Sequence, residues 1–133
     1  MATSRKEMTI ERSPEDVWDA VRDIGALHTR LVPGFVVDTR LEGEDRVVTF
    51  GNGMVVREPI LALDDAEHRL AWAAVGGPAK HYHAVLQVLP AERGTRVVWT
   101  SDFLPHELAP SIAGLQEQGL AVMKTALEAE KAG

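Results

Sequence analysis

Along most of the chain, hydrophobic and polar residues alternate with a period of two, which predicts β-strands. We expect seven of them, over residues 5–11, 35–42, 46–50, 54–63, 68–75, 81–89 and 95–103. Short runs of turn residues, such as Gly51-Asn52-Gly53, separate the later strands. Because such short connections can only join neighbouring antiparallel strands, the pattern predicts an antiparallel sheet.

Helical periodicity appears in three places. Ser13 is a suitable N-cap for a first helix that begins at Pro14 and runs to about Ile24. A second short helix is expected over residues 26–32 and a long one over residues 107–131. At 100° per residue, the long helix carries an apolar stripe made of Leu108, Ile112, Leu115, Gly119, Val122, Met123 and Ala126.

This order of elements predicts a single α+β domain over residues 1–133, with a helix-grip architecture: a seven-stranded curved antiparallel sheet around a long C-terminal helix, and two short helices between strands 1 and 2. The chain has only three Trp, one Tyr and three Phe to fill the space between sheet and helix. Gly114 and Gly119 remove further volume from the helix. We therefore expect an elongated apolar cavity, the usual form of a small-molecule site.

Charge and composition narrow the classes of partner. The 14 Lys and Arg against 20 Asp and Glu give a net charge of −6, which argues against nucleic acid and against anionic lipid surfaces. The absence of cysteine excludes disulfides and thiolate chemistry. No apolar run approaches the roughly 20 residues of a membrane span, and no signal-peptide core follows the N-terminus. We expect a cytoplasmic protein without membrane insertion.

Several segments resemble the START-like (SRPBCC) superfamily, and within it the group described as polyketide cyclase/dehydrase and lipid transport. The resemblance is carried by residues 13–18, 57–65, 69–72 and 95–99, and by Phe103. It implies the helix-grip fold over nearly the whole chain, while the superfamily includes enzymes, carriers and receptors. In the abscisic-acid receptors of this superfamily, a glutamate, an aromatic residue and a tyrosine line the pocket. Their pocket lysine has no counterpart in residues 35–39, which argues against an anionic carboxylate ligand.

Strand alternation places Glu58, Trp72, Tyr82 and Trp99 on the inner face of the sheet. A carboxyl group desolvated there would have a raised pKa and could act as a general acid or base. Alternatively, Glu58 pairs with Arg57, Arg69 or water. Tyr82 could donate a hydrogen bond to a ligand carbonyl, or it could be a core tyrosine with its hydroxyl at the cavity edge.

Further ligand contacts are expected from Trp99, Ile112, Gln116, Gly119 and His28. His81 and His83 project from one strand face with metal-ligand spacing, but no third ligand is evident, so we expect no metal site and no cofactor.

Three functions fit these features. The first is a binding or carrier module for a lipid-like or polyketide-like molecule. The second is a cofactor-independent polyketide cyclase or dehydratase with Glu58 and Tyr82 as catalytic groups. The third is a protein-interaction module, and the protein could be a monomer or a homodimer that associates through the outer sheet face. The valines considered for that face are Val36, Val48, Val55, Val85 and Val98.

Overall fold

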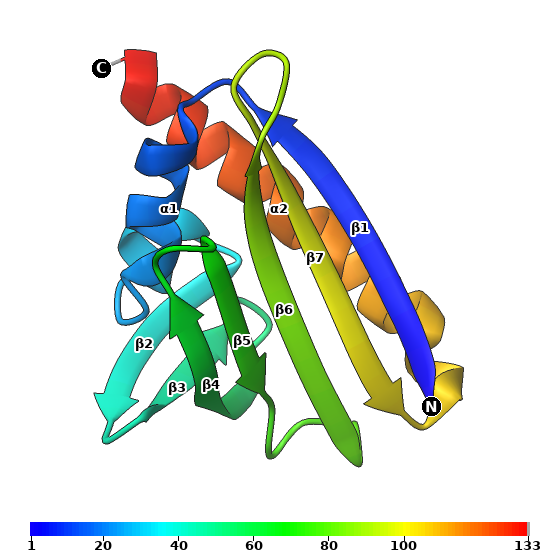
Figure 1. Ribbon diagram of the computed structural model, residues 1–133. Coiled ribbons are helices and arrows are strands. Elements are labelled where there is room, and N and C mark those ends of the chain that lie inside the picture. Colours follow the sequence, from blue (N-terminus) through cyan, green and yellow to red (C-terminus); the bar gives the residue numbers. More distant parts are fainter. Residues whose placement is uncertain (133) are drawn as a thin grey trace.

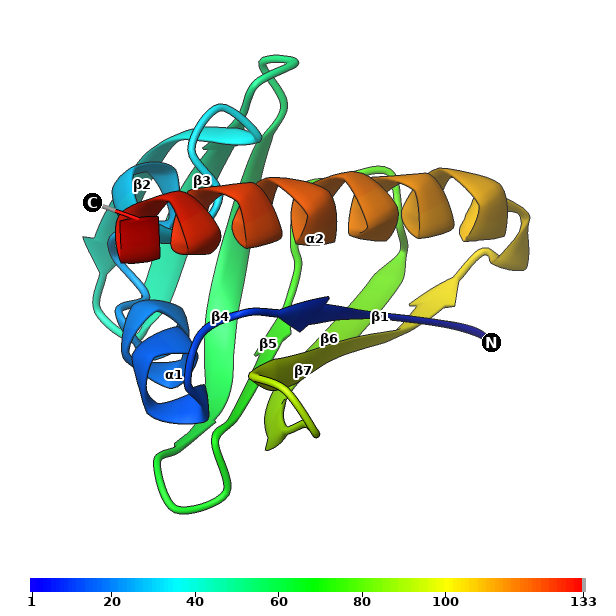
Figure 2. The same cartoon turned by 90° about the horizontal axis from the view of Figure 1, so that it is seen from above.

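A seven-stranded antiparallel sheet curves around one long helix, α2 (Ala109–Ala132), which lies across its concave face (Figures 1 and 2). The structure is a computed structural model that describes the backbone of residues 1–132 and the side chains of residues 1–130. The sheet order is β1-β7-β6-β5-β4-β3-β2, so the first strand closes one edge beside the last strand. The predicted helix-grip fold is confirmed.

The strand bounds agree with the periodicity to within one to three residues at most ends. The strands are β1 (Ala2–Ile10), β2 (Val36–Glu42), β3 (Asp45–Phe50), β4 (Val55–Asp64), β5 (Arg69–Ala73), β6 (His81–Pro90) and β7 (Thr95–Leu104). The largest difference is β1, which begins at Ala2 rather than at residue 5. Its inward positions include Ser4 and Lys6, and these polar side chains hide the alternation from a sequence reading.

Two short helices fill one end of the sheet, as predicted. Helix α1 (Pro14–Arg22) begins after Ser13, whose side chain accepts a hydrogen bond from the Asp16 backbone N–H at 3.1 Å. It ends two residues earlier than expected. The second element is one turn of π-helix, η1 (Leu27–Leu31). A single 3₁₀ turn, η2 (His106–Leu108), precedes α2, so the long helix begins slightly later than predicted.

Helix α2 buries a stripe that is rotated from the predicted one. Leu120 and Leu127 are almost fully buried although the stripe omitted them, whereas Leu115 and Val122 are only half-buried. The reason is that one side of the helix packs along β1 and against η1, while Leu115, which turns away from β1, faces the cavity.

The proposed apolar outer face is smaller than expected. Val36 and Val48 are in the hydrophobic core and line the cavity, so their assignment to the outer face was wrong. Val98 is buried as well, and only Val55 is exposed by more than half of its surface. The bulge between Val36 and Asp38 shifts the inward positions of β2 relative to the simple alternation. Val48 faces inward because it is the register partner of Val56 on β4.

Two glycines of α2 have opposite surroundings. A methyl group added at Gly114 would meet nothing within 4 Å, whereas one added at Gly119 would lie 2.9 Å from the Trp99 ring and 3.3 Å from Phe35. We predict that Gly114→Ala raises the free energy of unfolding by about 0.5–1 kcal/mol, because alanine favours helix. Gly119→Ala should lower it by about 1 kcal/mol or more through overpacking. Urea unfolding of both variants measures this contrast, and equal effects would contradict the packing at Gly119.

Candidate functional site

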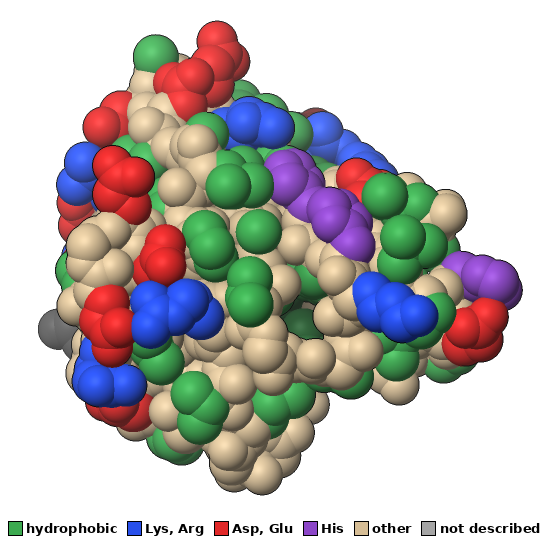
Figure 3. Space-filling view, turned by 90° about the horizontal axis from the view of Figure 1, so that it is seen from below, with side chains coloured by type: hydrophobic (Ala, Val, Ile, Leu, Met, Phe, Trp, Pro, Cys, Tyr) green, Lys and Arg blue, Asp and Glu red, His purple; other side chains and the backbone are tan. Residues whose placement is uncertain are grey.

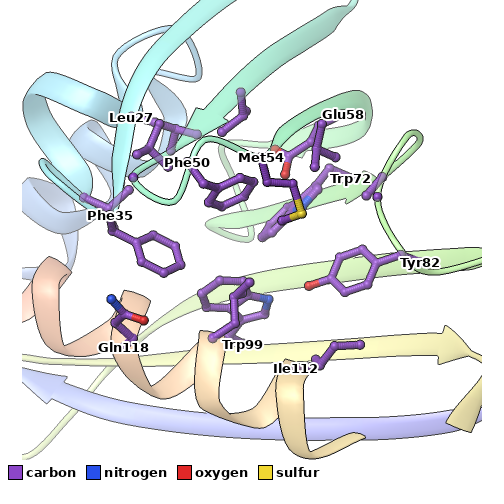
Figure 4. Close-up of a pocket in the computed structure, with 18 of the residues that line it drawn as sticks. Leu27, Phe35, Phe50, Met54, Glu58, Trp72, Tyr82, Trp99, Ile112 and Gln118 are labelled. Atoms are coloured by element: carbon purple, nitrogen blue, oxygen red, sulfur yellow. The ribbon is translucent and has the colours of Figure 1, made fainter. Parts of the chain in front are cut away.

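A cavity of about 780 Å³ lies between the concave face of the sheet and the N-terminal half of α2. Figure 3 shows a hollow on the corresponding face of the molecule, with hydrophobic side chains around it. Phe35, Phe50, Met54 and Ile112 are among the apolar residues of its wall (Figure 4). The size and the apolar wall are typical of a site for one small organic molecule.

The cavity also contains a buried ion pair. The Nε atom of Arg46 on β3 donates to Oε1 of Glu58 on β4 at 2.7 Å, and both residues are less than 10% exposed. The guanidinium also lies 5.3 Å from the ring centroid of Trp72, a distance that permits a cation–π contact. Because the two charges cancel, the wall of the cavity has no net charge near this pair.

Opposing influences act on the Glu58 carboxyl. Burial raises its pKa, because a low-dielectric surrounding disfavours the charged form, whereas Arg46 favours that form and opposes the rise. The expectation of a raised pKa therefore agrees with the geometry. The expected partners do not: Arg57 points to the other face and pairs with Glu42 and Asp45.

A sequence signal for Arg46 existed. The two strands β3 and β4 are joined through the turn around Asn52, and Arg46 and Glu58 are equally far from that residue. Residues equally spaced from the centre of a hairpin face each other, and these two are register partners. Arg57, as the neighbour of Glu58 in the same strand, necessarily points to the opposite face.

Tyr82 and Trp99 meet at a second polar point of the cavity (Figure 4). The Tyr82 hydroxyl lies 2.8 Å from Oγ of Ser101, which in turn accepts a hydrogen bond from Nε2 of Gln116 at 3.1 Å. Burial raises the pKa of the Tyr82 phenol to about 12, although Ser101 and Trp99 favour the ionised form. The phenol is therefore protonated at neutral pH.

Five predicted ligand contacts, Glu58, Trp72, Tyr82, Trp99 and Ile112, lie in the cavity wall. Three others do not. Gln116 is fully buried against β1 and β7, where it bonds to Ser4 and Ser101. Gly119 is covered by Trp99 and Phe35, and the His28 ring lies 3.2 Å from the Thr39 hydroxyl, away from the wall.

The remaining histidines contribute no cluster. His81 and His83 stand on β6 without a third ligand, and among the described side chains no group of three or more His, Asp or Glu could hold a metal ion. His68 stacks on Trp18 at 5.3 Å, while His106 pairs with Glu107 at the surface. Within residues 1–132, no helix is both long enough and apolar enough to cross a bilayer.

Comparison with known families gave one match over nearly the whole chain. The family described as polyketide cyclase / dehydrase and lipid transport matches residues 1–129. No curated protein matched the chain.

Several solved structures share the fold. XoxI from Bacillus cereus superposes with a TM-score of 0.86 at 22% identity, over 96% of each chain. A protein from Thermobifida fusca gives a TM-score of 0.76 at 27% identity, over 100% of this chain and 94% of the other. The di-domain ARO/CYC protein BexL from the BE-7585A biosynthetic pathway gives 0.81 at 16% identity, over 96% of this chain and 47% of BexL. At such low identities these similarities establish the architecture and not an activity.

Proposed function

Because this chain belongs to the polyketide cyclase/dehydrase and lipid transport family, as its sequence resemblance predicted, we propose that it binds one neutral, hydrophobic small molecule between sheet and helix. The observation that carries the proposal is the cavity of about 780 Å³ with a predominantly aromatic and aliphatic wall. Burial of apolar ligand surface there would supply most of the affinity. The ligand would be lipid-like or polyketide-like in size and polarity.

The charge balance of the cavity supports a neutral ligand. Arg46 is the cation of the wall, and Glu58 already compensates it at 2.7 Å. A carboxylate ligand would have to compete with Glu58 for the guanidinium and would lie close to a like charge. Moving such a charge out of water without a free partner is costly.

A cyclase or dehydratase activity has weaker support. The ARO/CYC label of BexL belongs to a protein with the same architecture and 16% identity. For proton transfer, Glu58 would have to use its second carboxyl oxygen, because Oε1 accepts a hydrogen bond from Arg46. Tyr82, with its raised pKa, is suited to donate a hydrogen bond rather than to remove a proton. Binding without catalysis therefore fits these two groups better.

Leu115→Trp tests the proposal by filling the cavity. Leu115 is half-buried and lies in the wall on α2, next to open space, so a larger ring can enter without displacing the core. We expect the affinity for prodan, a neutral naphthalene ketone whose fluorescence rises in apolar surroundings, to fall roughly tenfold or more. The titration uses direct excitation of the probe, and circular dichroism checks the fold.

The matched control is Leu115→Met, which conserves volume and should retain affinity. Saturable binding by the wild type with loss in Leu115→Trp alone supports the cavity as the site. Equal affinity of all three proteins, or no saturable binding by the wild type, would overturn the proposal.

A further inference from the structure

One buried donor in the cavity wall has no acceptor. The indole Nε1 of Trp99 makes no hydrogen bond of normal geometry to any described group, although it lies near enough to the Tyr82 oxygen to favour the ionised phenol, and Trp99 is only 8% exposed. In Figure 4 this nitrogen is directed toward the phenol oxygen of Tyr82, within the cavity. An unsatisfied N–H costs free energy in a buried position, so a group that supplies an acceptor there would be favoured.

The hydrogen-bond chain behind Tyr82 has a fixed direction. Nε2 of Gln116 faces the backbone carbonyl oxygens of Ser4 and Trp99, at 3.1 and 3.3 Å, and a carbonyl oxygen can only accept. Its Oε1 accepts from the Ser4 hydroxyl at 2.6 Å. The amide orientation is therefore determined, and Oγ of Ser101 accepts from Nε2 at 3.1 Å.

The direction of the chain leaves the proton of Tyr82 unused. Ser101 is fully buried, and its one recorded acceptor in the described part of the chain is the Tyr82 oxygen at 2.8 Å. The Ser101 proton therefore has an acceptor only when Ser101 donates to Tyr82. The phenol proton is free to point into the cavity, and it stays on the oxygen at neutral pH because burial raises the pKa of Tyr82.

Two donors thus converge at one point of the cavity wall, separate from the Arg46–Glu58 pair, and neither donor has an acceptor among the recorded contacts. Resting on the proposed function, we propose that Tyr82 and Trp99 select a ligand with an uncharged acceptor, of which a ketone or other carbonyl oxygen is the simplest form. The carbonyl oxygen has two lone pairs, so it can accept from both donors. The apolar remainder of the ligand would lie toward Phe50 and Met54.

The test compares prodan with its analogue in which a methylene group replaces the carbonyl. We expect the wild type to bind prodan about three- to tenfold more tightly than the analogue. Trp99→Phe and Tyr82→Phe should each move this ratio toward one. Phe50→Leu is the matched control, because it removes a ring of the same cavity without a donor and should weaken both probes equally.

A measurement on the wild type alone covers the case in which a variant does not fold. The infrared carbonyl stretch of bound prodan should lie below its frequency in an apolar solvent, because hydrogen bonds weaken the carbonyl bond. Saturable binding with equal affinity for both probes, an unchanged ratio in both donor variants, or an unshifted carbonyl stretch would each overturn this inference and leave the proposed function intact. Absence of saturable binding of either probe would overturn the proposed function itself.

Discussion

Arg46→Met should lower the free energy of unfolding by about 3–5 kcal/mol at neutral pH, the largest stability effect that we expect from a single substitution in this chain. The variant leaves the buried Glu58 carboxylate without its partner at 2.7 Å. The double variant Arg46→Met, Glu58→Met removes both charges and should recover most of the loss, since apolar pairs of similar volume replace buried ion pairs at little cost. Urea unfolding of the two variants measures the difference.

The deficit of Arg46→Met should grow with pH. Burial raises the folded-state pKa of Glu58 above its ordinary value of 4.5, and removal of Arg46 raises it further. Between the folded-state pKa of the wild type and the higher one of the variant, only the variant still binds an extra proton in its folded state. The stability of the variant therefore falls as the pH rises through this window, while that of the wild type does not. A deficit that is independent of pH would contradict an unpaired Glu58 as its cause.

Arg57→Met is the matched control for this cycle. Arg57 is the next arginine along the chain, and its pairs with Glu42 and Asp45 are exposed on the outer face. Surface pairs of this kind contribute about 0–1 kcal/mol. If Arg57→Met lowered the free energy of unfolding as much as Arg46→Met, burial of the arginine in the cavity wall would not be the cause of the effect.

Glu58→Gln should reverse the charge preference of the cavity. The amide keeps the size of the side chain and an acceptor for Arg46. It leaves the guanidinium charge uncompensated in the wall of the cavity of about 780 Å³. We expect the affinity for laurate relative to dodecanol, which has the same chain without the charge, to rise by about a hundredfold. Calorimetric or competition titrations against prodan give both dissociation constants.

Glu42→Gln makes the same change of charge on the outer face, where Glu42 pairs with Arg57 at 2.6 Å. It should leave the laurate-to-dodecanol ratio unchanged. The interpretation of a charge-balanced cavity fails if Glu58→Gln also leaves the ratio unchanged, because a ligand would then not reach Arg46.

The architecture was accessible from the sequence because it depends on regular patterns. Alternation along β4 to β7 placed Glu58, Trp72, Tyr82 and Trp99 on the inner face, and the structure has all four in the cavity wall. Element order alone indicated the grip of the sheet on α2. Such periodicity is a local property that tertiary packing preserves.

The partners of the site residues were less accessible, because they depend on register and on contacts between distant segments. Gln116 was expected at the ligand, yet it bonds to Ser4, which is 112 residues away in the chain. Gly119 was expected to enlarge the cavity, whereas the rings of Trp99 and Phe35 occupy the space. Arg46 was missed because its neighbour Val47 is apolar and also buried, so the hydrophobic pattern of β3 does not show that the charged residue faces inward. None of these contacts has a periodic signature.

The three indole N–H signals in a ¹H–¹⁵N correlation spectrum test the hollow, ligand-binding interior most directly. Trp72 and Trp99 line the cavity, whereas Trp18 belongs to α1 and donates to Asp65 at 2.9 Å, outside the wall. During a titration with prodan, we predict that the signals of Trp72 and Trp99 move and saturate together while that of Trp18 stays in place. Signals that all remain unchanged in excess probe, or a Trp18 signal that moves as far as the other two, would contradict a ligand site between sheet and helix.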